Sequence, residues 1–195
     1  CAAVLLALAL AAAPVPAAHA ATAEDLYKSA LEARRANDFD RAVQLLTEAR
    51  AMAPKDADIL LLLGQIQGFQ QRYDLALDTL GQAQALAPDY ADVRLAIARI
   101  RSYQGRYAEA AAEVDAVLAR DPGNTEALAL KGRIALYQNR LDEAEGAYRA
   151  ARDAAPNLAD PHVGLGDVAA ARGQFDAAAA EYDEAEAREP GNADI

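Results

Sequence analysis

The chain has 195 residues, of which 53% are hydrophobic, 6% aromatic and 25% charged, and its net charge is −11. Because much of the apolar content is alanine, the composition favours closely packed helices over a core of large aromatic side chains. A strongly acidic chain is a poor partner for a nucleic-acid backbone or an anionic membrane surface, so we expect no nucleic-acid partner.

Residues 1–20 consist of an apolar run, two prolines and the small-residue triplet "AHA" at 18–20. This order is typical of a secretory signal peptide, with cleavage expected before Ala21. The apolar run is shorter than the roughly 20 residues that span a bilayer, which favours a cleaved signal over a membrane anchor. With no Met at position 1 and no basic segment, we expect the signal to be N-terminally incomplete. We therefore predict export to the periplasm or cell envelope of a bacterium, and Cys1, the single cysteine, would be lost with the signal.

Beyond the signal, the chain repeats every 34 residues, as its prolines show: Pro54, Pro88, Pro122, Pro156 and Pro190. A fixed period of this length is typical of stacked supersecondary units. Five complete units are predicted, at 23–56, 57–90, 91–124, 125–158 and 159–192. Residues 193–195 repeat the start of a unit, so a truncated sixth unit is expected there. Any membrane association would then come only from sequence beyond residue 195.

Each unit is predicted to contain two helices, separated near unit positions 14–16. The second helix ends at the proline, which lacks a backbone donor and disfavours helical geometry in the residue before it. Unit position 20 is always alanine: Ala42, Ala76, Ala110, Ala144 and Ala178. Position 8 is also small, whereas positions 17 and 24 are bulky. Small residues let two antiparallel helices approach closely, and we expect the bulky ones to fill the seams between units.

Unit position 2 is always acidic: Glu24, Asp58, Asp92, Glu126 and Asp160. A carboxylate in the first turn of a helix stabilises the unpaired amides there. We therefore interpret this column as helix capping rather than as a metal or catalytic array.

The repeated pattern resembles the tetratricopeptide repeat, which favours small residues at positions 8, 20 and 27, an aromatic or aliphatic residue at 24 and proline at 32. The resemblance covers residues 23–192 and implies an all-α, right-handed superhelical solenoid of helix-turn-helix units. Two columns depart from the family pattern, since position 4 lacks the usual Trp and position 11 lacks the common Tyr. The third unit, with Arg94 and Arg101 at these positions, is the least regular.

Candidate catalytic groups are scarce in the repeats. His162 is the only histidine there and occupies a packing position at the start of a helix, so we expect it to be structural. The triplet "GLG" at 164–166 does not follow a strand, and packing explains Gly166. No nucleophile–base pair, metal-ligand cluster or phosphate-binding glycine loop is recognisable. We predict no enzyme, no cofactor and no metal site.

The resemblance implies that the first helix of each unit lines a concave groove through positions 5, 9, 12 and 13. Position 13 carries Phe69, Tyr103 and Tyr137, and position 9 carries Arg99 and Arg133. Two interpretations stay open. The rings extend the packing between helices, or the rings and arginines together bind an extended ligand, with the rings against apolar groups or sugars and the arginines as fixed donors.

Three functions fit these features. The first is a non-catalytic scaffold or adaptor in the cell envelope that binds a partner protein or peptide in its groove. The second rests on the segments "SYQGRYAEAAAEVDAVLARDPGN" and "LYQNRLDEAEGAYRAARDAAPN", which are similar to repeats preceding the β-barrel in YaiO-type and exopolysaccharide-export outer-membrane proteins. That resemblance implies a periplasmic arm engaged with a polysaccharide or an assembly partner. The third, a substrate-binding arm of a transferase, would need a catalytic domain beyond residue 195.

Overall fold

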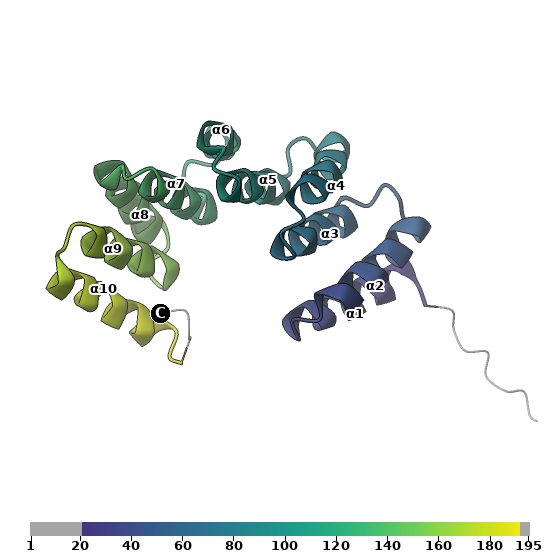
Figure 1. The fold of residues 1–195 in the computed structure, drawn as a ribbon, viewed down its shortest axis with the longest axis horizontal. Helices are drawn as coiled ribbons and strands as arrows, with labels where there is room; N and C mark the ends of the chain where they lie inside the picture. The colour runs from purple at the N-terminus through teal and green to yellow at the C-terminus, as the bar shows by residue number, and fades with distance from the viewer. Residues whose placement is uncertain (1–20, 192–195) are drawn as a thin grey trace, which may run out of the picture.

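A computed structural model describes residues 21–191 of the chain. This part folds into ten α-helices and contains no strand, so the all-α prediction is confirmed (Figure 1). None of these helices is long and apolar enough to cross a bilayer. The predicted signal peptide (1–20) and the start of a sixth unit (193–195) lie outside the described residues.

The helices alternate between two sets along the chain. The odd-numbered helices are α1 (Ala23–Arg35), α3 (Ala57–Phe69), α5 (Ala91–Tyr103), α7 (Thr125–Tyr137) and α9 (Asp160–Ala171). The even-numbered helices are α2 (Phe39–Met52), α4 (Tyr73–Leu86), α6 (Tyr107–Leu118), α8 (Leu141–Ala154) and α10 (Phe175–Arg188).

A left-handed residue at unit position 15 ends every odd-numbered helix: Asn37, Gln71, Gly105, Asn139 and Gly173, with φ between 56° and 74°. The following amide then bonds back to the carbonyl five residues earlier, as Asp38 does to Ala33 at 2.9 Å. This is the arrangement that closes a helix C-terminus and turns the chain. Glycine and asparagine adopt it most readily, so Gln71 is the exception.

Polar side chains begin several of the odd-numbered helices. Thr22 and Asp25 form a reciprocal capping box at α1, and Asp56 and Asn124 accept hydrogen bonds from first-turn amides of α3 and α7. The acidic residue at position 2 lies in the first turn of each odd-numbered helix. These acidic residues therefore sit where the helix dipole favours negative charge.

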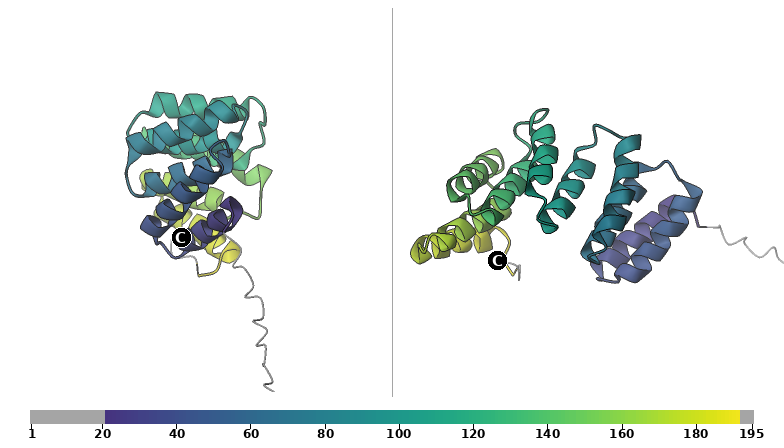
Figure 2. Two further views of the ribbon diagram at one scale, coloured as in Figure 1. Left: turned by 90° about the vertical axis from the view of Figure 1, so that its right-hand side faces the viewer. Right: turned by 45° about the horizontal axis from the view of Figure 1, so that its top comes forward.

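The helix pairs stack into an open arch. Within each pair the two helices pack together, and α2, α4, α6 and α8 each pack on the odd-numbered helix that follows. The helices α3, α5, α7 and α9 also contact their odd-numbered neighbours directly. The pairs α1–α2 and α9–α10 form the two separated ends of the arch, so the helices do not close into a bundle (Figures 1 and 2).

The contact between small and bulky residues is clearest around Tyr148, which is 3% exposed. A Cβ on Gly132 would lie 2.9 Å from its ring, and a Cβ on Gly164 would lie 2.2 Å from Cε1 of the same ring. Gly132 belongs to α7 and Gly164 to α9, so a bulky residue at position 24 fills the seam between units, as predicted. Burial raises the pKa of Tyr148 to about 12.

Two ion pairs to one carboxylate stabilise the irregular third unit. Glu113 on α6 accepts hydrogen bonds from Arg94 at 2.8 Å and from Arg101 at 2.9 Å, and its side chain is only 12% exposed. A shared carboxylate thus binds the two arginines that make the third unit the least regular.

His162 on α9 is buried, with 6% of its surface exposed. Its Nδ1 lies 2.8 Å from Oε2 of Glu181 on α10, whereas its Nε2 has no hydrogen-bond partner. This contact joins the two helices of the last pair, in keeping with the structural role expected for this residue.

Candidate functional site: the concave groove

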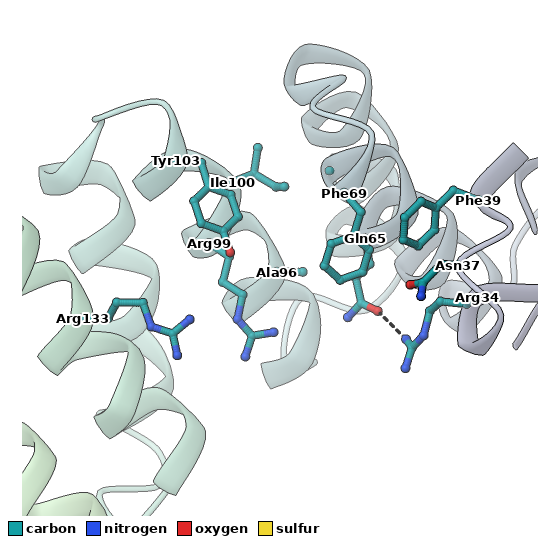
Figure 3. Close-up of a pocket in the computed structure, with 11 residues that line it drawn as sticks. Arg34, Asn37, Phe39, Gln65, Phe69, Ala96, Arg99, Ile100, Tyr103 and Arg133 are labelled. Atoms are coloured by element: carbon teal, nitrogen blue, oxygen red, sulfur yellow. Dashed lines mark hydrogen bonds between the residues drawn. The ribbon is translucent and has the colours of Figure 1, made fainter. Parts of the chain in front are cut away.

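The main hollow of the arch is a cavity of about 670 Å³ that is lined chiefly by the odd-numbered helices. The side chains come from α1, α3, α5 and α7 together with the turn and helix start at 37–39 (Figure 3). The large lining side chains are Arg34, Phe39, Gln65, Phe69, Arg99, Tyr103 and Arg133. Because four successive units contribute, the hollow is a groove across the repeats rather than a pocket within one of them.

The rings at position 13 each pack against a ring at position 17 of the preceding unit. Phe69 stacks on Phe39 with centroids 5.7 Å apart, and the pairs Tyr73–Tyr103 and Tyr107–Tyr137 are tilted at 6.2 Å and 6.3 Å.

The same rings nevertheless keep a free surface. Phe69 remains 58% exposed, Tyr103 48% and Tyr137 50%. Each ring therefore joins neighbouring units through one side while the other side stays open to solvent. The ring row (Phe69, Tyr103 and Tyr137) thus takes part in packing, as the first interpretation expects, and also keeps an exposed aromatic surface. Binding of a ligand by this surface stays a prediction.

Three arginines form a second row, the arginine row (Arg34, Arg99 and Arg133). Arg99 and Arg133 occupy position 9 of adjacent units. Arg34 occupies position 12 of the first unit, but its side chain extends towards position 9 of the next unit. Its Nη1 lies 3.5 Å from Oε1 of Gln65, the residue at that position. Figure 3 shows the three guanidinium groups along one edge of the groove, with the rings of Phe39, Phe69 and Tyr103 on the other side. Glu126 at the start of α7 forms an ion pair with Arg99.

The groove changes sign towards α9. A smaller hollow of about 260 Å³ is lined by Arg133, Tyr137 and Tyr148 together with Asp160 and Asp167. Asp167 occupies position 9, like Arg99 and Arg133.

A hydrogen bond from α10 orients the carboxylate of Asp167. The hydroxyl of Tyr182 donates to Asp167 at 2.9 Å, and desolvation together with this bond raises the pKa of Tyr182 to about 12. The large hollow is therefore lined by arginines without a carboxylate. Carboxylates lie beyond it, with Glu126 at the start of α7 and Asp160 and Asp167 on α9.

Four of the five residues predicted from the sequence lie around the large hollow, namely Phe69, Arg99, Tyr103 and Arg133; Tyr137 lies in the smaller one. Sequence reasoning did not single out Arg34, Phe39 or Gln65, although Gln65 occupies the expected groove position 9. Position 12 was among the expected groove positions, and the residue it carries in the first unit is Arg34. Phe39 was assigned to packing alone.

The described part of the chain contains no group of three or more His, Cys, Asp or Glu side chains that could hold a metal ion. The groove residues place guanidinium donors beside exposed aromatic rings.

Two family models described as tetratricopeptide repeat match the chain. One matches residues 95–159 and 162–195, and the other matches residues 33–100. A search of curated proteins finds no match.

Several solved structures share the fold. The thermophilic TPR protein TTC0263 of Thermus thermophilus superposes with a TM-score of 0.81 at 17% identity, covering 89% of this chain and 94% of its own. MamA (41-end) of Desulfovibrio magneticus RS-1 gives 0.65 at 19% identity, with 88% and 97% covered. YrrB, described as a TPR protein with an unusual peptide-binding site, gives 0.56 at 19% identity, with 87% and 88% covered.

Proposed function

Because this chain belongs to the tetratricopeptide-repeat family, we propose that it is a non-catalytic scaffold that binds a peptide segment of a partner protein in its concave groove. The observation that carries the proposal is the ring row, whose members are each about half exposed although they are anchored from behind by another ring. Large exposed aromatic surface beside fixed donors is typical of a protein-binding site. YrrB, which shares the fold, is described as having a peptide-binding site.

The packing of each groove ring on a second ring favours binding, because a ligand loses affinity for every side chain that it must order. Phe69 is already held against Phe39, and Tyr103 against Tyr73. A ligand that contacts their free faces therefore meets rings that are in position before it arrives. This preorganisation supports the groove, rather than the outer helices, as the binding surface.

Photo-crosslinking tests this proposal. The photoreactive analogue benzoylphenylalanine replaces Phe69, which is 58% exposed in the groove, or Leu75, a control that is 40% exposed on α4 and contributes to none of the hollows described above. We expect a defined partner to be crosslinked from position 69 and not from position 75. Equal crosslinking from both positions, or from position 75 alone, would refute the groove as the binding site.

As part of the same proposal, the scaffold works in the cell envelope. The support is in the sequence, where an apolar run and an "AHA" triplet precede Ala21. Fractionation of cells that produce the chain with its natural leader tests it, since the periplasmic fraction should contain a product that begins at Ala21. Recovery of the uncleaved chain in the cytoplasm would contradict it.

The alternative role is that of a periplasmic arm of an outer-membrane β-barrel protein engaged in polysaccharide export. Its support is the pair of repeat segments around "YQGR" and "YQNR". The sequence of the gene beyond residue 195 decides between these roles: alternating ten-residue strands would favour the barrel, and a polar capping helix the plain scaffold. A nucleotide-binding motif would favour the third role, the binding arm of a transferase.

A further inference from the structure

The charge of the groove is opposite to that of the protein. The chain carries a net charge of −11, yet the residues that line the large hollow include three arginines and no carboxylate. A random distribution of side chains on an acidic surface would place carboxylates there. The arginine row is therefore a local feature that calls for its own explanation.

Two of these arginines have no acidic partner. Among the described residues, Arg34 and Arg133 form no ion pair. Arg34 approaches Gln65, and Arg133 lies near the Tyr148 hydroxyl. Arg133 also lines smaller hollows with Glu126, Asp160 and Asp167, but pairs with none of these carboxylates. Arg99 does pair with Glu126, but this pair is exposed to solvent, with side chains 36% and 48% accessible. An exposed pair is worth little, and a guanidinium has further donors to offer a second carboxylate. All three groups are thus available to a ligand.

From this arrangement we infer that the groove takes an extended acidic peptide whose carboxylates contact the arginine row while its apolar side chains contact the ring row. The inference rests on the proposed function and specifies the chemistry of its ligand. Charge complementarity selects the acidic peptide: guanidinium forks match carboxylates. A dense polyanion such as a nucleic acid would meet the repulsion of the whole acidic chain and the carboxylates at the α9 end of the groove.

The spacing of the rows defines the sequence pattern of the ligand. Arg99 and Arg133 lie at the same position of α5 and α7, which contact each other, and packed helices have axes about 8–10 Å apart. A polyproline-II segment repeats every three residues and rises about 3.1 Å per residue, so residues i and i+3 lie about 9 Å apart on one side. Acidic residues three apart therefore fit successive arginines.

The ring row runs beside the arginine row. Position 13 lies four residues beyond position 9, about 6 Å along each helix at 1.5 Å per residue. A second side of the same segment, one residue away in sequence, then faces Phe69 and Tyr103. The pattern expected of the ligand is acidic, apolar, any residue, repeated across the units. The acidic residues of the peptide should end before they reach α9, because position 9 of that helix carries Asp167 instead of an arginine.

A display library of random peptides about twelve residues long, selected on the whole chain, tests the inference without assuming a ligand. Peptides enriched in Asp or Glu at intervals of three, with apolar neighbours, are expected. A synthetic copy of the best peptide and its Glu→Gln version are then compared by fluorescence anisotropy. The acidic form should bind at least about tenfold more tightly, and raising the salt should reduce this difference.

Charge reversal in the chain supplies the matched control. The variant Arg133→Glu, which changes the net charge by the same amount as its control, should lose much of the preference for the acidic peptide. Arg41→Glu, which changes an exposed arginine on α2, should retain it.

The contrary results separate the inference from the proposed function. Enriched peptides that lack acidic residues but still require Phe69 and Tyr103 would overturn the acidic ligand and leave peptide binding in the groove standing. Failure to enrich any peptide would overturn both. Displacement of the bound peptide by alginate or single-stranded DNA at lower concentrations than by the unlabelled peptide would overturn the peptide class in favour of another polyanion.

Discussion

The close packing of Tyr148 makes the substitution Gly164→Ala a sharp test of how the units are joined. The added Cβ would lie 2.2 Å from Cε1 of Tyr148 and 2.4 Å from Cδ1 and Cζ. Carbon atoms in contact are normally at least about 3.5 Å apart, so the ring or the helix would have to move by roughly 1.3 Å. The ring has little room to yield, because a Cβ on Gly132, on the other helix that it contacts, would already be 2.9 Å away.

Overpacking of this kind costs about 1–3 kcal/mol, and the better helix propensity of alanine returns up to about 1 kcal/mol. We expect Gly164→Ala to lower the free energy of unfolding by about 1–2 kcal/mol, which corresponds to a fall in Tm of about 2–8 °C for a chain of this size. Thermal and urea unfolding followed by circular dichroism measure both quantities.

Gly146→Ala is the matched control, because a Cβ at this site in α8 meets nothing within 4 Å. It should raise the free energy of unfolding by up to about 1 kcal/mol. Tyr148→Leu should remove most of the penalty in the Gly164→Ala background, since a smaller side chain frees the space that the new methyl group needs. If Gly164→Ala were as stabilising as Gly146→Ala, the ring would not be tightly held between units and the reasoning would be wrong.

Three further predictions concern charge, pH and the rings. Glu113→Gln should lower the free energy of unfolding by about 1–3 kcal/mol, because two arginines lose their shared carboxylate; an unchanged urea midpoint would contradict this. The raised pKa of Tyr148 means that the fold favours the neutral phenol. The stabilisation from Tyr148 should therefore be intact below the unfolded pKa of about 10, and about 2–3 kcal/mol of the free energy of unfolding should be lost towards pH 12. Tyr148→Phe should flatten the plot of unfolding free energy against pH in this range. An unchanged plot for this variant would contradict the prediction. Tyr103→Ala should weaken peptide binding at least about tenfold, whereas Phe175→Ala, which removes a ring that is 72% exposed on α10, should leave binding unchanged; equal losses would show that ring exposure alone explains the result.

The periodic features of the fold could be predicted from the sequence because they are local. Proline spacing, the small residue at position 20 and the acidic residue at position 2 each act within one helix or one helix pair. Their effect therefore does not depend on how the units are rotated against each other. The same reasoning identified Tyr148 as a seam-filling residue, although the matching small residue, Gly164 at position 6, became evident only from the contact itself.

The contacts between units were harder to predict. The pairing of Phe69 with Phe39 joins residues 30 apart, and the approach of Arg34 to Gln65 depends on a long side chain crossing from α1 to α3. Both depend on the rise and rotation from one unit to the next, which a single repeat does not encode. For the same reason the sequence left open whether the rings pack or bind. The structure shows the packing and the exposed faces of the rings, and ligand binding by these faces stays a prediction.

The central claim is that the concave groove, and no other surface, binds an extended peptide. The most direct measurement is an NMR titration of the isotopically labelled chain with the selected peptide. We predict that shift changes concentrate on the arginine row and the ring row of α1, α3, α5 and α7. Changes that concentrate on the outer faces of α2, α4, α6 and α8, with the two rows unaffected, would contradict the account.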